Sequence, residues 1–268
     1  MVAVVRRQLG LRAVGHAGTL DPFATGLLVV LVGRATRLAR FAEAARKVYD
    51  ADVHFGIGTD TDDGTGAVLA EQEPASWPTR AEMDAQLARF VGPLWQRPPA
   101  YSAKHVAGRR SHQLARQGRA VELPEVRVLV HALDCIEWAP PRLRLRATVG
   151  KGTYLRALAR DLGAAIGLPA HCSALRREAI GSFRVADAIG PQEVTRDAVR
   201  SPLAMVPDLS RLLLDEAARR EVGFGRSIAR RDGGAEEVAL VAADGSLVAV
   251  AEARGERWQP VVVLEPAA

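Results

Sequence analysis

Residues 15–28 read Gly15-His16-Ala17-Gly18-Thr19-Leu20-Asp21-Pro22-Phe23-Ala24-Thr25-Gly26-Leu27-Leu28. The glycines and threonines of residues 14–26 are typical of a loop, and Pro22 disfavours a helical conformation at Asp21. The apolar run over 27–32 predicts a buried strand that would support this loop rigidly. From these residues alone, Asp21 is either a turn aspartate bonded to its own backbone or a carboxylate presented for chemistry.

Helical and strand patterns alternate along the rest of the chain. Residues 2–9 have the pattern of the last part of an amphipathic helix, which Gly10 ends. Thr79 is the predicted N-cap of a helix that runs to about Phe90. The remaining pattern predicts helices over 34–46, 153–166 and 212–221, a turn over 58–66, and strands over 47–57, 126–138, 143–149, 172–180, 238–242, 247–251 and 261–264. Asp244-Gly245 predicts a hairpin turn. This order favours a mixed domain of strands and helices rather than a bundle or a β-sandwich.

The composition is that of a soluble globular protein. The chain has 268 residues, of which 48% are hydrophobic and 25% are charged. Its two cysteines, Cys135 and Cys172, lie in no paired motif, which argues against a disulfide framework or a structural zinc site and favours a reducing cytoplasm. No apolar run approaches the roughly 18 residues of a membrane span, so no membrane partner is expected.

The positive charge is concentrated in one stretch. The net charge is +5, and the stretch from Arg97 to Arg119 contains no Asp or Glu. Its cations are Arg97, Lys104, Arg109, Arg110, Arg116 and Arg119, and its rings are Tyr101, His105 and His112. Cations bind phosphates and rings stack on bases, so the stretch favours a nucleic-acid surface. A merely solvated face is the alternative.

One acidic motif is a near-miss for a metal site. The segment Asp60-Thr61-Asp62-Asp63-Gly64 is similar to the start of a calcium-binding loop. Such a loop needs a ligand at position five and glycine at position six, where this chain has Gly64 and Thr65. We therefore expect no metal here.

Residues 15–28 closely resemble the catalytic segment of the bacterial tRNA pseudouridine-55 synthases. Further segments match this family in the right order: Lys47-Val48-Tyr49, Gly58-Thr59-Asp60-Thr61-Asp62, Arg97-Pro98-Pro99-Ala100-Tyr101-Ser102-Ala103-Lys104, Ala115-Arg116-Gln117-Gly118, Lys151-Gly152-Thr153-Tyr154-Leu155-Arg156 and Leu175-Arg176-Arg177. Together they cover residues 1 to about 190.

The resemblance implies an α+β fold, with a pseudouridine-synthase-like mixed, largely antiparallel sheet flanked by helices. It places a catalytic domain over 1–200 and a small, β-rich, PUA-like domain over 205–268. Members of the family begin with a strand and a Lys-Pro-x-Gly-x-Thr-Ser segment, which this sequence lacks. We therefore expect the catalytic domain to be truncated at its N-terminus.

The resemblance also implies roles for individual residues. Asp21 would be the nucleophile that isomerises a uridine to pseudouridine, and Arg156 would pair with it and favour its charged form. Tyr49 would stack on the target base, and Tyr154 would lie against it near C5. Without the resemblance, Arg156 is a helix-surface arginine and both tyrosines are core residues. The reaction replaces the C1′–N1 bond with a C1′–C5 bond and changes no oxidation state, so no cofactor is needed.

The implied substrate is uridine 55 in the T-arm stem-loop of tRNA, without an obligate protein partner. His16 would fill the space that a flipped nucleotide leaves. The RNA contacts would come from Arg97, Tyr101, Lys104, Arg109, Arg110 and Arg116. Arg37 and Arg40 would add phosphate contacts, or else are solvated arginines. Two alternatives are a guide-RNA-dependent relative and a non-catalytic tRNA-binding or tRNA-folding protein.

Overall fold

The computed structural model describes residues 1–101, 105–106, 109–110, 123–230 and 234–266. The side chains of 105–106 and 109–110 are outside this description. The chain forms two compact units. The first comprises residues 1–19, 28–43 and 187–268, and the second comprises 20–27 and 44–186. The second unit carries the candidate catalytic residues.

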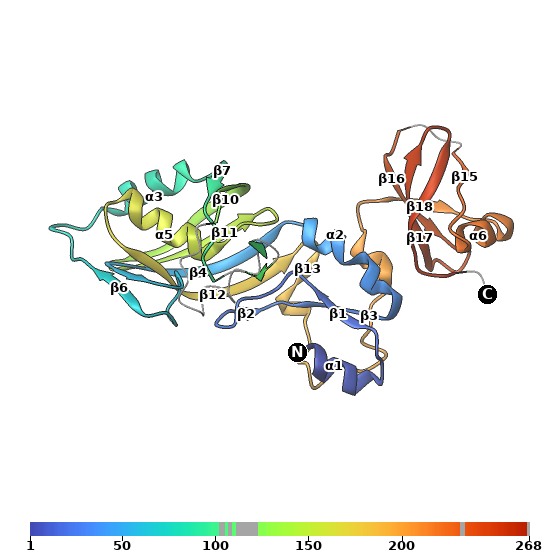
Figure 1. Cartoon of the computed structure of the whole chain (residues 1–268), viewed down its shortest axis with the longest axis horizontal. Coiled ribbons are helices and arrows are strands. Elements are labelled where there is room, and N and C mark those ends of the chain that lie inside the picture. Colours follow the sequence, from blue (N-terminus) through green and yellow to red (C-terminus); the bar gives the residue numbers. More distant parts are fainter. Residues whose placement is uncertain (102–104, 107–108, 111–122, 231–233, 267–268) are drawn as a thin grey trace. The chain divides into compact units, whose positions relative to one another are not determined.

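A seven-stranded sheet forms the second unit (Figure 1). Its main path runs β13-β12-β4-β11-β10-β7, and β2 pairs with β12 off this path. The strands are β2 (Thr25–Gly26), β4 (Lys47–Phe55), β7 (Gly92–Gln96), β10 (Val126–Ala139), β11 (Arg142–Val149), β12 (Ala170–Ile180) and β13 (Phe183–Arg184). All the pairings are antiparallel except that of β2 with β12. This mixed, largely antiparallel sheet confirms the expected α+β class.

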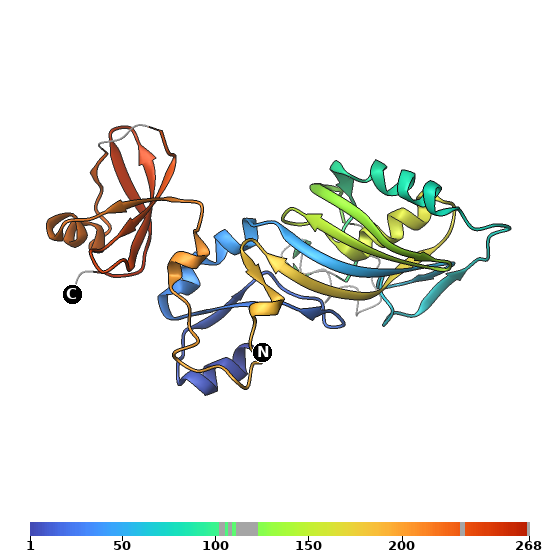
Figure 2. The same ribbon diagram turned by 180° about the vertical axis from the view of Figure 1, so that it is seen from behind.

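Helices α3 (Arg80–Arg89) and α5 (Leu155–Ala165) cover one face of this sheet (Figures 1 and 2). The predicted cap of α3 is confirmed, because Thr79 and Glu82 form a capping box. Helix α5 presses closely against β12, since a Cβ on Gly163 would lie 2.5 Å from the Cβ of Ala170. Only glycine permits this approach, which fixes α5 and the residues at its start.

The core lies between the sheet and these helices. Alternate β4 residues are buried, from Lys47 through Tyr49 to Phe55, as the period of a strand requires. Those from Tyr49 to Phe55 pack with buried leucines of β11 and with the apolar side of α5: Leu143, Leu145, Leu155, Leu158 and Leu162. A small antiparallel pair, β5 (Ile57–Thr59) and β6 (Val68–Glu71), follows β4 along the chain.

The first unit contains the N-terminal elements and a β-rich C-terminal part. Its N-terminal elements are α1 (Val2–Leu9), β1 (Val14–Ala17), β3 (Val29–Val32), η1 (Gly33–Leu38) and α2 (Ala39–Ala44), which continues to the boundary of the unit. The C-terminal part is a five-stranded sheet in the order β14-β16-β17-β18-β15 with helix α6 (Glu216–Gly223). These strands are Ser210–Leu213, Glu237–Val241, Leu247–Arg254, Arg257–Val263 and Ile228–Ala229. The expected β-rich C-terminal part is confirmed.

Some local predictions need correction. The loop expected over 14–26 contains β1 and β2, because pairing with distant strands orders short glycine-containing segments. The helix expected over 34–46 begins as a 3₁₀ turn, and the helix expected over 212–221 begins as β14. In the described part of the chain, no helix is long and apolar enough to cross a membrane.

Candidate active site

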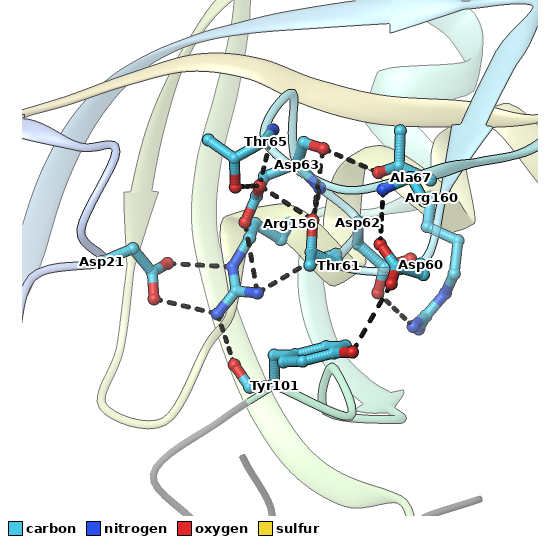
Figure 3. A network of polar contacts seen from close by, with 11 residues as sticks. Asp21, Asp60, Thr61, Asp62, Asp63, Thr65, Ala67, Tyr101, Arg156 and Arg160 are labelled. Atoms are coloured by element: carbon cyan, nitrogen blue, oxygen red, sulfur yellow. Dashed lines mark hydrogen bonds and ion pairs between the residues drawn. The ribbon is translucent and has the colours of Figure 1, made fainter. Parts of the chain in front are cut away.

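Asp21 and Arg156 form a bidentate ion pair (Figure 3). The Nε of Arg156 donates to Oδ2 of Asp21 over 3.0 Å, and its Nη2 donates to Oδ1 over 2.9 Å. The Arg156 side chain is 4% exposed, whereas that of Asp21 is 31% exposed. The carboxylate is therefore held on its buried side and open on the other. The expected pairing is confirmed, and the helix-surface interpretation of Arg156 is wrong.

The loop that carries Asp21 is fixed to the sheet. Ala24 N–H donates to the Asp21 carbonyl, and Thr25 and Gly26 pair with β12. A Cβ on Gly26 would lie 2.3 Å from the carbonyl oxygen of Arg177, and φ at Gly26 is +96°. Glycine is therefore required there, and it brings the loop onto the central strands.

Arg156 uses its remaining donors on the protein itself. Nη1 donates to the Thr61 carbonyl over 2.8 Å, and Nη2 donates to the Tyr101 carbonyl over 2.9 Å. A second carboxylate, Asp63, lies 3.5 Å from Nη1. A buried guanidinium needs such partners, because unpaired burial of a charge costs several kcal/mol. These contacts fix the plane of the guanidinium against Asp21.

Asp63 belongs to a loop whose structural role the sequence did not reveal. Its Oδ1 accepts hydrogen bonds from Thr61 Oγ1, Thr65 Oγ1 and Thr65 N–H at 2.8, 2.6 and 3.0 Å (Figure 3). The sequence feature that could have predicted this role is the two-residue spacing of Thr and Asp, because these short side chains form hydrogen bonds with neighbouring backbone in turns. The segment that resembles a calcium loop therefore supports the Arg156 side chain.

Arg160, one helical turn after Arg156, makes similar contacts with a carboxylate and a backbone carbonyl. Its Nη1 donates to Asp62 Oδ2 and its Nη2 donates to the Arg97 carbonyl, each over 2.9 Å. Burial raises the pKa of Asp62, although the Arg160 and Arg156 charges oppose the shift. Two arginines of α5 thus connect the acidic loop with residues 97–101.

Tyr49 lies in the centre of the sheet beside a buried arginine. It stands opposite Arg177 in the pairing of β4 with β12, and Cζ of Arg177 is 6.0 Å from the centre of its ring. Arg177 is 1% exposed, and its Nε donates to the Leu27 carbonyl over 2.8 Å. Burial raises the pKa of Tyr49, while the charge and hydrogen bonding of Arg177 lower it. The phenol is therefore kept neutral at neutral pH.

Tyr154 is half-buried at the N-cap of α5, two residues before Arg156. Gln96, which is 1% exposed, bonds both the N–H and the carbonyl of Tyr154. Sequence reasoning did not identify Gln96. The only sequence feature that could have indicated its role is its position directly before the segment rich in arginine and proline.

The expected RNA contacts fall into three groups. Arg97 is exposed and Tyr101 is half-buried, with its hydroxyl 3.4 Å from Asp60 Oδ2. Lys104, Arg116 and the side chains of Arg109 and Arg110 lie outside the described residues. His16 and Arg37 are exposed in the other unit, where Arg37 Nη1 donates to the Val263 carbonyl. Arg40, which was left open, pairs there with Glu237 and Glu252.

No group of three or more metal-ligating side chains is arranged to hold an ion among the residues that the structure describes. The carboxylates of the acidic loop accept hydrogen bonds or pair with arginines instead.

Comparison with known proteins places this chain among the pseudouridylate synthases. The family described as "TruB family pseudouridylate synthase (N terminal domain)" matches residues 6–155. A second family, "tRNA Pseudouridine synthase II, C terminal", matches residues 209–265. The chain belongs to the TruB family, as the resemblance in its sequence implied.

Curated relatives agree with this assignment. A protein of Thermobifida fusca named tRNA pseudouridine synthase B is 41% identical over 275 residues, which cover 98% of this chain and 92% of that protein. A protein of Xanthomonas campestris with the same name is 43% identical over 213 residues, or 80% of this chain and 67% of that protein. A third, from Symbiobacterium thermophilum, is 42% identical over 84% of this chain and 77% of its own length.

Solved structures share the fold. The chain matches one from "Crystal structure of the archaeal box H/ACA sRNP Nop10-Cbf5 complex" with a TM-score of 0.72 and 22% identity, over 99% of this chain and 81% of that one. A chain from "Structure of H/ACA RNP bound to a substrate RNA containing 2'-deoxyuridine" matches with a TM-score of 0.73 and 21% identity, over 99% of this chain and 80% of that one. At this identity the likeness concerns the fold alone.

Proposed function

We propose that the chain converts uridine 55 in the T-loop of tRNA to pseudouridine, with Asp21 as the nucleophile. The observation that carries this proposal is the half-open carboxylate of Asp21, fixed by both nitrogens of a buried Arg156. The relatives named tRNA pseudouridine synthase B, about 40% identical over most of the chain, support tRNA as the substrate.

The chemistry balances with the substrate alone. An Asp21 oxygen bonds to C1′ of the ribose as the bond from C1′ to N1 breaks, and the electron pair stays on uracil. The uracil turns, C5 bonds to C1′, and the carboxylate leaves. The proton on C5 is lost and N1 gains one, so the product is an isomer of the substrate. Arg156 disperses the charge of the carboxylate when it leaves.

The two tyrosines have separate roles in this proposal. The neutral ring of Tyr49 stacks on the uracil, and Tyr154 lies near C5, where it assists removal of the proton. Reaching this site requires the target base to leave its stack, which costs a few kcal/mol. The RNA around the target base is held by Arg97, Tyr101, Lys104, Arg109, Arg110 and Arg116. His16 and Arg37 are proposed as further RNA contacts. We place the activity in the cytoplasm.

The test uses an unmodified T-arm stem-loop carrying tritium at C5 of uridine, with no other protein or RNA. Pseudouridine formation releases the tritium to water. We expect release from the wild-type chain, none from a stem-loop with cytidine at position 55, and none from Asp21→Asn. Asp21→Asn should still bind the stem-loop. Full activity of this variant would overturn the role of Asp21.

The same assay separates the alternatives. Release only after a guide RNA and partner proteins are added would identify a guide-RNA-dependent enzyme. Binding that weakens steeply with salt, without any release, would identify a non-catalytic tRNA-binding protein.

A further inference from the structure

Trp95 is the exposed tryptophan of this chain. Its exposed fraction is 68%, whereas Trp258 is 1% exposed and Trp77 and Trp138 pack edge to face against each other. Leaving a ring of this size in water forgoes the free energy that its burial would contribute. An isolated exposed apolar side chain is common, so the surroundings of Trp95 decide whether it has a function.

Three arginines lie near this ring. Arg127 of β10 stands directly opposite Trp95 in the pairing of the two strands, which puts both side chains on one face. Arg97 follows Trp95 by two residues, and Arg89 lies at the end of α3. Within the described ranges, no carboxylate forms an ion pair with Arg89, Arg97 or Arg127. We call Trp95, Arg89, Arg97 and Arg127 the β7 patch.

The patch borders a shallow hollow. Its lining includes Arg89, Trp95, Arg97, Arg160, Glu125 and Asp161. The two carboxylates do not reverse its sign, because Asp161 pairs with Arg160 over 2.9 Å and Glu125 is then outnumbered by Arg89 and Arg97. Positive charge therefore predominates around an exposed ring.

The patch adjoins the candidate active site through β7. Side chains alternate along a strand, so Gln96 points inward while Trp95 and Arg97 point outward. Gln96 bonds the backbone of Tyr154, and the Arg97 carbonyl accepts from Arg160. An RNA that is held in the site and extends past the edge of β7, which Figure 1 shows beside β10, would reach this patch.

We propose that the β7 patch is a second contact for the substrate RNA, where Trp95 stacks on an unpaired base other than the target and Arg89, Arg97 and Arg127 bind the adjacent phosphates. An exposed ring between cations is what sequence-tolerant binding of single-stranded RNA requires. This inference rests on the proposed function and deepens it.

The test compares Trp95→Ala, Trp95→Phe and a control, Leu69→Ala, which removes another exposed apolar side chain (73% exposed, on β6). We measure the Kd of full-length unmodified tRNA, the KM and kcat of tritium release, and the thermal midpoint. Trp95→Ala should raise Kd and KM about tenfold and leave kcat and the midpoint unchanged. Trp95→Phe should recover most of the loss, and Leu69→Ala should behave as wild type.

Salt provides a second readout. Arg97→Ala and Arg127→Ala should each make the dependence of log K on log salt concentration less steep by about one. A Kd of Trp95→Ala equal to that of the wild type would overturn the inference. If the oligomeric state changes while the Kd does not, the edge of β7 is a protein contact instead. If the wild-type chain forms no pseudouridine while Trp95→Ala still weakens RNA binding, the proposed function fails and the patch stands.

Discussion

The side-chain amide of Gln96 forms two hydrogen bonds with the backbone of Tyr154, over 3.1 Å to its carbonyl and 2.9 Å from its N–H. A buried amide thereby fixes the start of α5, where Tyr154 and Arg156 stand. Leucine has a similar volume and offers no partner to either backbone group.

Gln96→Leu should lower the free energy of unfolding by about 2–4 kcal/mol, because two buried polar groups lose their partners. We also expect a lower kcat with little change in KM, since Tyr154 would be misplaced while the RNA-binding residues remain. The matched control is Gln72→Leu, because the exposed Gln72 donates to the Gly167 carbonyl away from these residues. Denaturant unfolding and tritium release measure both effects. A stable Gln96→Leu variant with wild-type kcat would contradict this role.

Arg156→Lys tests the bidentate pair. Lysine keeps the charge but cannot contact both Asp21 oxygens in one plane. We expect kcat to fall by a factor on the order of 10² or more, while the Kd for the stem-loop stays within about threefold. Arg160→Lys is the control, because Arg160 bonds Asp62 and the Arg97 carbonyl but not Asp21. It should lose much less activity.

A double variant extends this test. If Asp21 and Arg156 act as one unit, Asp21→Asn combined with Arg156→Lys should be little worse than Asp21→Asn alone. Losses in kcat that simply multiply would show that the two side chains act independently.

The sequence predicted the Asp21–Arg156 pair because both residues lie in motifs whose order and identity are specific. It did not predict the support from Asp63 or Gln96, since each acts through a contact about 60 to 90 residues away along the chain, which local patterns do not encode. The regular elements with strong periodicity, such as β4 and α5, were predicted well. The two-residue strand β2 was missed, because its conformation depends on its partner, β12.

Gly26→Ala tests the attachment of the catalytic loop. The new Cβ would meet backbone at Arg177 and would also need a positive φ, so the loop must move. We expect the free energy of unfolding to fall by about 2–4 kcal/mol and kcat to fall by a large factor. The control is Gly10→Ala, where φ is +66° but nothing lies within 4 Å of the new Cβ. That variant should lower the free energy of unfolding by only about 1–2 kcal/mol, because alanine disfavours the positive φ. Equal costs for the two variants would rule out the steric argument.

Tyr49→Phe separates the ring of Tyr49 from its hydroxyl. If the ring stacks on uracil, Phe should retain kcat/KM within a few-fold, whereas Tyr49→Leu should lose about tenfold or more. Tritium release at several RNA concentrations measures both values. A loss in Tyr49→Phe as large as that in Tyr49→Leu would assign the function to the hydroxyl instead.

The same substitution makes a prediction about alkaline stability. Burial raises the pKa of Tyr49, so the folded chain holds the phenol proton more tightly than the unfolded chain, whose tyrosines titrate near pH 10. The resulting stabilisation is fully present below about pH 10 and is lost as pH rises through the higher folded pKa. Phenylalanine has no such proton. Denaturant unfolding from pH 8 to 11 should therefore show the wild type losing stability relative to Tyr49→Phe only above about pH 10, and a constant difference would mean that burial does not hold this proton.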